Sequence, residues 1–304
     1  MGVKRVVGYP CINNTLADIK PVSEAIRVNR GMIKKTFKSK GLEYAGELAM
    51  QNLSDLEKVI EWNYAHNIQL YRMFSDMFPW SSEYTIDKLP QSKDIIKQLK
   101  HVGKLAKKYK QRLTFHPGQF DVLASPNKDV VKKTLHDLEF HGSIMDYMNL
   151  PKTVYSKINI HVGGSYGDKE AALERFCTNF KKLSLSVRKR LTVENEDKES
   201  LYTVQELYDG VYKKIGIPIV FDNLHHDLHP GELSEKEAFL LAYKTWPKDI
   251  EPIVHIAQKK RSKKYTHADY VTICFDTHRK KVAIMLEAKG KEKAVLKYVK
   301  NCYS

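Results

Sequence analysis

Cysteine is scarce in this 304-residue chain, and its four thiols, Cys11, Cys177, Cys274 and Cys302, are scattered without a C-x-x-C pair. Since neither a secretory context nor the spacing of a zinc knuckle is present, we expect four reduced thiols. The chain also lacks an 18-residue apolar run and a signal-peptide-like apolar segment after Met1, which excludes a membrane-spanning helix. These absences predict a soluble, intracellular protein of the cytoplasm or nucleoid.

Acidic residues are in the minority, with 36 Asp and Glu against 51 Lys and Arg, a net charge of +15. Such an excess favours a polyanionic partner, most simply nucleic acid, although many soluble proteins are basic without binding one. Five of six residues in Lys259–Lys264 are basic. This run directly follows a predicted strand, so we interpret it as a phosphate-binding loop, with Lys259, Lys260 and Arg261 contacting DNA, rather than as a solvated loop.

No linker, low-complexity tract or internal repeat divides the chain, which predicts one domain over residues 1–304 and a monomer. Eight short, apolar, β-branched runs follow one another along it: Val3–Tyr9, Gln69–Met73, Arg112–Phe115, Lys157–Val162, Leu191–Glu194, Ile217–Asp222, Pro252–Ile256 and Val282–Glu287. Short, continuously apolar runs are typical of parallel strands buried on both faces.

Helical patterns lie between most of these runs. Leu53, Leu56 and Ile60 share one face of the stretch 52–66, and Asp168 is a candidate N-cap for the stretch 168–183. We interpret residues 17–51 as a long basic connection. Alternating β and α units give either a doubly wound sheet or a closed barrel, and eight strands favour a single (β/α)8 TIM barrel.

The ends of six predicted strands carry imidazole or carboxylate groups, and in a TIM barrel these ends meet on one face. A single histidine is often structural, whereas six such placements indicate a cluster of ligands. Imidazole with carboxylate suits Zn²⁺ or Mn²⁺ in an open catalytic site, and the set is sized for two or three ions, as in phosphodiester hydrolysis. The candidate ligands are His116, His161, Glu194, Asp222, His225, His255 and Glu287, with His267 as an eighth.

Two further segments offer side chains to the same face. Gln119 and Phe120 follow His116 in a sharp Pro-Gly loop, where they are either a wedge between DNA bases or, for Phe120, core filler. Tyr9 and Asn13 follow the first strand and are candidates for phosphate or substrate contact.

The chain resembles the UV damage endonuclease family in eight segments and a basic stretch, in order. They are GYPCINNTL, NLSDLEKVIEWN, TFHPGQF, IHVGGSYGDKEAAL, LTVENED, VFDNLHHDLHPGELSEKEA, VHIAQ with the basic run after it, and MLEAKGKE. The resemblance covers about Val6 to Lys293. It implies a xylose-isomerase-like TIM barrel related to endonuclease IV, with a divalent metal cluster, usually Mn²⁺ and alternatively Zn²⁺ or Mg²⁺. It also implies incision 5′ of cyclobutane pyrimidine dimers, six-four photoproducts and some abasic sites.

Carried over by motif, the eight candidate ligands become metal ligands, and Gln119 and Phe120 become a lesion-probing pair. Glu194 would bridge two ions, and Asp222, Glu287 and Tyr9 would complete the catalytic set. The chain departs from the family pattern at three positions: Glu83 stands where a histidine is expected and is a further candidate ligand, Phe120 replaces a frequent tyrosine, and Ile253 occupies a position where relatives carry lysine.

We therefore predict a metal-dependent endonuclease that acts on double-stranded DNA with UV lesions. The rivals are an apurinic endonuclease, a metal-dependent sugar isomerase or epimerase, and a DNA-binding module that has lost catalysis. The charge of +15 argues against a neutral sugar substrate.

Overall fold

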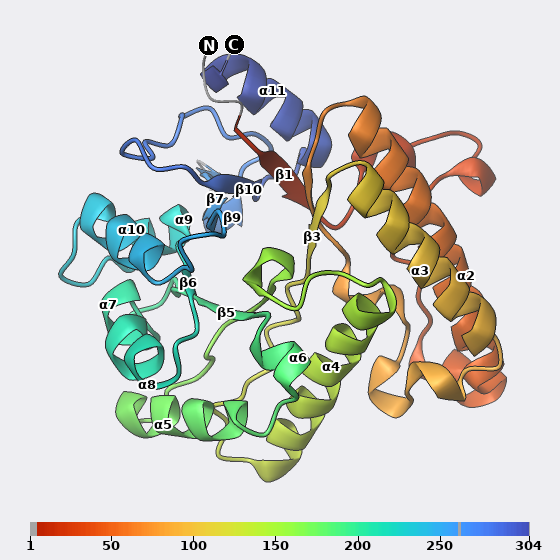
Figure 1. The fold of residues 1–304 in the computed structure, drawn as a ribbon, viewed down its shortest axis with the longest axis horizontal. Helices are drawn as coiled ribbons and strands as arrows, with labels where there is room; N and C mark the ends of the chain where they lie inside the picture. The colour runs from red at the N-terminus through yellow and green to blue at the C-terminus, as the bar shows by residue number, and fades with distance from the viewer. Residues whose placement is uncertain (1–4, 261–262, 304) are drawn as a thin grey trace.

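The computed structural model describes residues 5–260 and 263–303, where eight short parallel strands alternate with helices (Figure 1). Each overlaps one of the eight predicted apolar runs, and nearly every strand residue is buried. The strands are β1 (Val7–Pro10), β2 (Leu70–Arg72), β3 (Arg112–Thr114), β4 (Ile158–Ile160), β5 (Leu191–Glu194), β6 (Ile219–Val220), β7 (Ile253–Ile256) and β10 (Ala283–Leu286).

The strands form a central parallel sheet in two parts. One part has the order β3-β2-β1-β10-β7 and the other the order β4-β5-β6. Single parallel bridges, Phe115 with Ile158 and Asp222 with His255, join residues of the two parts. Because the pairing is parallel, the carboxyl ends of neighbouring strands lie at the same edge, which is where the candidate ligands occur.

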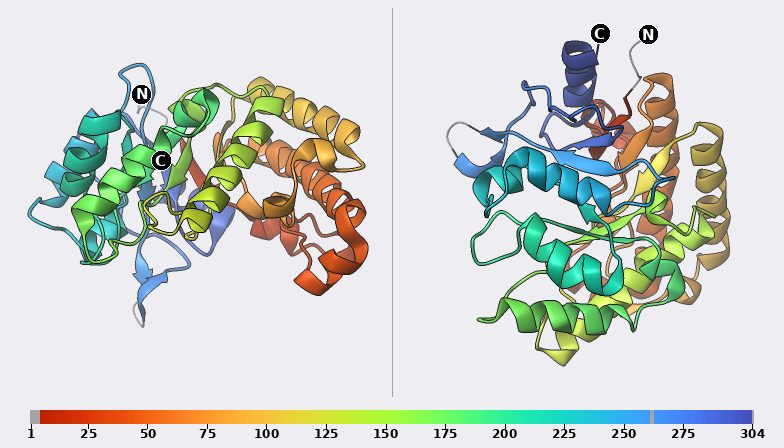
Figure 2. Two further views of the ribbon diagram at one scale, coloured as in Figure 1. Left: turned by 90° about the horizontal axis from the view of Figure 1, so that it is seen from below. Right: turned by 60° about the vertical axis from the view of Figure 1, so that its left-hand side comes forward.

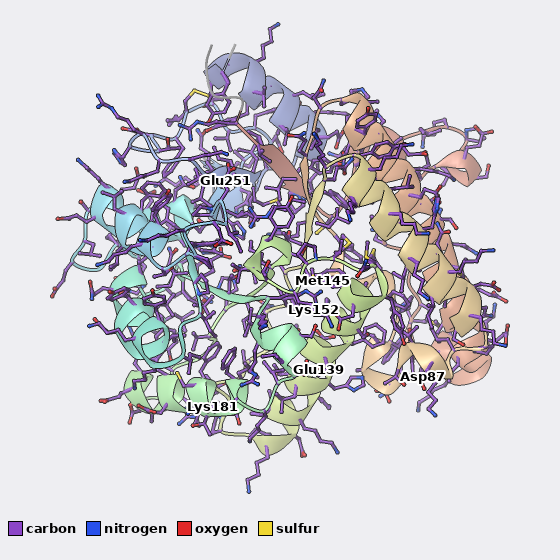
Figure 3. The ribbon with its side chains drawn as sticks, viewed as in Figure 1. Asp87, Glu139, Met145, Lys152, Lys181 and Glu251 are labelled. Atoms are coloured by element: carbon purple, nitrogen blue, oxygen red, sulfur yellow. A yellow bond between two sulfur atoms is a disulfide. The ribbon has the colours of Figure 1, made fainter. Side chains whose placement is uncertain are left out.

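Helices cover the strands from outside (Figures 1 and 2). Buried apolar side chains of helices and strands form the core, and Figure 3 draws the side chains on the ribbon. The longer helices are α2 (Lys34–Ala65), α3 (Ser92–Lys108), α4 (Lys128–Tyr147), α5 (Lys169–Phe180), α10 (Glu235–Lys244) and α11 (Lys291–Tyr303). The short ones are α1 (Asn14–Ala17), α6 (Leu185–Arg188), α7 (Val204–Leu207), α8 (Lys213–Ile215) and α9 (Asn223–Leu228). None of the helices in the described residues is both long and apolar enough to cross a bilayer.

Helix boundaries follow local chemistry where a cap is present. The Asp168 side chain accepts a hydrogen bond from the Ala171 amide and so caps α5, as predicted. The prediction of a connection over residues 17–51 is wrong, because α2 begins at Lys34 and contains a non-helical Gly41. Buried side chains of α2 begin only at Ala45, so its first turns carry no apolar stripe that the sequence could reveal.

The basic run was predicted as a loop, and this too needs correction. Its described residues belong to an antiparallel hairpin of β8 (Lys259–Lys260) and β9 (Lys263–His267), which projects from the body of the molecule (Figure 2). Lys259 and Lys260 are exposed on β8, and Lys259 Nζ lies 2.9 Å from Asp227 Oδ2. Arg261 lies outside the described residues.

The cysteine prediction is wrong for two of the four thiols. Cys274 and Cys302 form a disulfide that joins the segment before β10 to α11, while Cys11 and Cys177 are free. Partners 28 residues apart give no spacing signal, so only the packing of α11 against the end of the sheet brings them together.

Candidate metal centre

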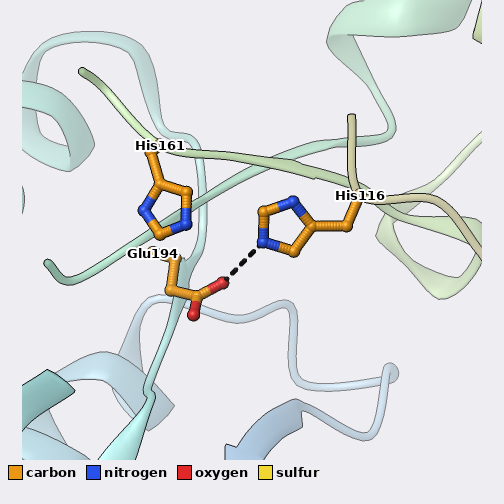
Figure 4. Close-up of side chains that lie close together, drawn as sticks. All are labelled: His116, His161 and Glu194. Carbon is orange, nitrogen blue, oxygen red and sulfur yellow. Dashed lines mark hydrogen bonds and ion pairs between the residues drawn. The ribbon is translucent and has the colours of Figure 1, made fainter. Parts of the chain in front are cut away.

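The centre is built around Glu194, the last residue of β5, which is only 1% exposed. Three imidazoles surround its carboxylate. Oε2 lies 3.2 Å from His116 Nε2 and 3.0 Å from His255 Nδ1, and Oε1 lies 3.4 Å from His225 Nδ1. Figure 4 shows His116 and His161 reaching toward Glu194 from neighbouring segments. These side chains therefore converge in space although His116 and His255 are 139 residues apart in the sequence.

Glu287 follows β10 and extends the cluster on one side. One of its oxygens, Oε1, lies 3.3 Å from His255 Nδ1 and 2.5 Å from Arg72 Nη1. The other, Oε2, lies 3.9 Å from Nδ1 of His267, the last residue of β9. On the opposite side His161 Nδ1 lies 3.3 Å from Oε2 of Glu196, a carboxylate that the predicted ligand set leaves out.

Two groups of three residues have the geometry of cation sites. Within each group, one potential ligand atom per residue lies within 4.8 Å of the others: His116, His161 and Glu194 in the first, and Glu194, Asp222 and His255 in the second. Glu194 is common to both. One atom here, Asp222 Oδ2, is buried without a hydrogen-bond partner among the described residues, and His161 Nδ1 and His255 Nδ1 face carboxylate oxygens at 3.3 and 3.0 Å. A buried carboxylate oxygen without a partner is costly unless a cation satisfies it, so the residues fit a metal cluster.

The tautomer of His116 also indicates a cation beside Glu194. Its Nδ1 lies 3.1 Å from the Pro117 carbonyl oxygen, which only accepts, so the ring proton belongs on Nδ1. Burial lowers the pKa of His116, which favours the neutral imidazole. In this tautomer the lone pair of Nε2 faces the Glu194 carboxylate at 3.2 Å. Two acceptors at this distance repel each other unless a cation lies between them.

Charge is concentrated in the rest of the cluster. Burial raises the pKa of Asp222 to about 7, and the carboxylates of Glu194 and Glu287 add to this shift. Burial lowers the pKa of His225, but Asp222 and Glu194 outweigh burial and raise it to about 10. Without a metal, this centre therefore holds protons that a bound cation would replace.

Polar residues behind the ligands fix their orientation. Asn159 Nδ2 donates to Glu194 Oε2, and Thr192 Oγ1 donates to Asn159 Oδ1 at 2.7 Å. Asn195 Nδ2 donates to the Asp222 carbonyl at 3.0 Å. Sequence reasoning missed these residues, although a polar side chain inside an apolar strand run, as in KINIHV, is a usable signal.

Three predicted site residues lie apart from this cluster. Glu83 is exposed at the end of a short 3-10 helix and belongs to neither ligand group. Tyr9 is fully buried, and its hydroxyl donates to Asn63 Oδ1 at 2.8 Å. Asn13, also buried, donates from Nδ2 to the Tyr9 hydroxyl at 2.9 Å. These bonds join β1 to α2 and leave neither side chain open to a phosphate in this conformation.

Gln119 and Phe120 do lie beside the centre. Both line a cavity of about 1060 Å³ whose walls also include His161 and His225. The Phe120 side chain is 82% exposed, which excludes the alternative that it is core filler.

One buried histidine of a helix lies outside the centre. His141 is buried in α4, where its Nδ1 lies 3.0 Å from Asp137 Oδ2. Burial lowers the pKa of His141, but Asp137 outweighs burial and raises it to about 9. This imidazole is a charged structural group.

The sequence model of one family, described as UV-endonuclease UvdE, matches residues 5–304. The chain belongs to this family. A UV DNA damage endonuclease of Clostridium perfringens is 34% identical over 96% of this chain and 69% of its own length. The UV-damage endonuclease of Schizosaccharomyces pombe is 35% identical over 95% of this chain and only 49% of its own length, so the chain spans about half of that relative.

Among solved structures, the crystal structure of SacUVDE superposes with a TM-score of 0.84 at 29% identity and covers 98% of this chain and 97% of that one. A D-psicose 3-epimerase of Clostridium cellulolyticum H10 has a TM-score of 0.53 at 14% identity, over 81% of this chain and 83% of that one. The second likeness shows a shared fold alone. The UvdE family match therefore favours an endonuclease over the sugar isomerase alternative.

Proposed function

We propose that this member of the UvdE family is a metal-dependent endonuclease that incises double-stranded DNA 5′ of UV photoproducts. The observation that carries the metal requirement is the convergence of imidazole nitrogens of His116, His225 and His255 on the buried Glu194 carboxylate, at 3.0 to 3.4 Å. The observation that carries the DNA substrate is family membership, together with the charge of +15.

We also infer that the eight strands close into a (β/α)8 barrel. The bridges Phe115–Ile158 and Asp222–His255 support closure, since they connect the two parts of the sheet at both junctions. In such a barrel all strand ends would point toward one rim, which accounts for the convergence of ligands from β3, β4, β5, β6, β7 and β10.

The predicted ligand set would hold two or three ions, with Mn²⁺ as the expected metal and Zn²⁺ or Mg²⁺ as alternatives. Glu194 would be shared between ions, while Asp222, His255 and Glu287 would hold one side and His116 and His161 the other. When bound, such ions supply an activated water and stabilise charge on the attacking and leaving oxygens of a phosphodiester. Tyr9 and Asn13 would act by positioning the turn after β1, because both are buried.

DNA would lie across the face that carries the cavity and the hairpin. Phe120 and Gln119 would probe the stack, and Lys259, Lys260 and Arg261 would contact phosphates, as positioning contacts do. We expect the protein to act as a monomer.

Nicking of supercoiled plasmid tests the proposal. UV-irradiated and untreated plasmid are compared with Mn²⁺ present, and again after addition of EDTA. We expect nicking of irradiated plasmid only, and only with the metal. Oligonucleotide duplexes with one cyclobutane dimer, one six-four photoproduct or one abasic site then define the lesion and the incised bond. Incision restricted to the abasic duplex would favour the apurinic endonuclease, and metal-independent nicking would refute the proposed centre.

A further inference from the structure

Tyr166 is an exposed aromatic residue that neither the ligand cluster nor the probing loop accounts for. It lies between β4 and α5, in the loop that begins with His161. Its side chain is 48% exposed and lines the same cavity as Phe120. The exposed part of this ring is therefore open to a ligand that offers an aromatic surface.

The backbone holds Tyr166 in an unusual conformation. Its φ is +53°, in the left-handed region, and Gly163 and Gly167 nearby have φ of +92° and +83°. Glycine adopts this region at little cost, whereas a bulky residue with a Cβ does not. Non-glycine residues in such regions persist where the surrounding structure fixes them, and they are concentrated at ligand sites.

The ring is also held in place by its neighbours. A Cβ at Gly164 would lie 3.3 Å from Cζ of the Tyr166 ring, so the absence of a side chain there leaves room for the ring against the backbone. The Arg175 guanidinium lies 5.7 Å from the ring centroid, and its Nε donates to the Ala124 carbonyl at 2.8 Å. Ala124 belongs to the loop that carries Phe120, so Arg175 connects the two aromatic residues of the cavity.

From these observations we propose that Tyr166 is a stacking platform for an unstacked DNA base in the cavity, a second aromatic contact beside Phe120. The proposal rests on the proposed function, because it assigns the cavity to a nucleotide of the damaged duplex. A base can stack on any aromatic face whatever its identity, which suits a site that accepts several lesions. Since the ring is fixed before DNA binds, little conformational entropy is lost on contact.

The test separates the ring from the backbone. Tyr166→Asn removes the ring but suits a positive φ, and Tyr166→Phe keeps the ring without its hydroxyl. Single-turnover incision of a duplex with one thymine dimer gives the half-saturating protein concentration. A 2-aminopurine next to the dimer reports stacking by its fluorescence in EDTA. Tyr64→Ala is the matched control: Tyr64 is 57% exposed and stacks on another tyrosine, but it lies near the end of α2, just before β2 begins.

We expect Tyr166→Asn to raise the half-saturating concentration about 5- to 150-fold, the change that corresponds to about 1–3 kcal/mol for one stacked base. The 2-aminopurine fluorescence change should shrink with it, and Tyr166→Phe and Tyr64→Ala should match the wild type in both measurements. Wild-type behaviour of a folded Tyr166→Asn variant would overturn the inference, and so would a loss in Tyr166→Phe as large as in Tyr166→Asn. Failure of the wild type to prefer the dimer duplex would instead refute the proposed function.

Discussion

Asn159 connects the interior of the sheet to the candidate metal centre through Glu194. Replacing this side chain should weaken metal binding even though Asn159 is not a candidate ligand. The side chain is 0% exposed. Its amide donates to Glu194 Oε2 and accepts from Thr192 Oγ1 at 2.7 Å, which fixes the amide orientation. Glu194 belongs to both potential ligand groups, so a loss of orientation here affects the whole cluster.

The size of the expected loss of Mn²⁺ affinity follows from the charge of the acceptor, the Glu194 carboxylate. A hydrogen bond to a charged group contributes about 1.5–3 kcal/mol, and each 1.4 kcal/mol is about tenfold in an equilibrium constant. We therefore expect Asn159→Ala to lower Mn²⁺ affinity about 10- to 100-fold, the range usual for residues behind metal ligands. Thr192→Val should cost less, about 0.5–1.5 kcal/mol, because it breaks a bond between neutral groups.

Mn²⁺ affinity is measured from the electron paramagnetic resonance signal of free Mn²⁺ during titration. Asn179→Ala is the matched control, because Asn179 is also buried and donates to the Leu123 carbonyl at 2.8 Å, away from the centre. It should lower the free energy of unfolding while leaving Mn²⁺ affinity at the wild-type value. Wild-type Mn²⁺ affinity in folded Asn159→Ala would refute the assigned role of Asn159.

Four further outcomes follow. Glu194→Gln should abolish incision, with folding checked by circular dichroism; near-wild-type incision would contradict a shared ligand. Phe120→Ala should lose the preference for UV-irradiated over intact DNA while Mn²⁺ affinity stays unchanged, and a retained preference would show that the exposed ring does not probe the lesion. Neutralising Lys259 and Lys260 should flatten the slope of log affinity against log salt; weaker binding with an unchanged slope would indicate a structural role. His141→Gln should destabilise the protein by roughly 3 kcal/mol near pH 6 but little at pH 10. The reason is that the protonated imidazole of His141, whose pKa is raised to about 9, stabilises the folded state. This contribution is complete below about pH 6.5 and is lost as the pH rises through 9. Equal losses of unfolding free energy at both pH values, measured by urea unfolding, would argue against a charged imidazole.

Much of this protein was determined by local sequence. Short β-branched runs specified all eight parallel strands, because a strand buried on both faces must be apolar along its length. Asp168 specified the start of α5 by the same local chemistry. The positions of the ligands followed from one rule: residues at the carboxyl ends of parallel strands share an edge. His116, Glu194 and His255 do meet there.

Tertiary structure decided what depends on partners distant in the chain. The amide of Asn159 acquires its role only because β4 pairs with β5, which brings Glu194 beside it. Cys274 meets Cys302 only because α11 packs back against the sheet. The first turns of α2, before Ala45, form without an apolar stripe that the sequence could reveal. Tyr9 lies near the carboxyl end of β1 like a site residue, yet its hydroxyl donates to Asn63 of α2. A sequence shows which groups a strand end offers, but the distances to residues elsewhere in the chain decide whether those groups face a cation, a base or the core.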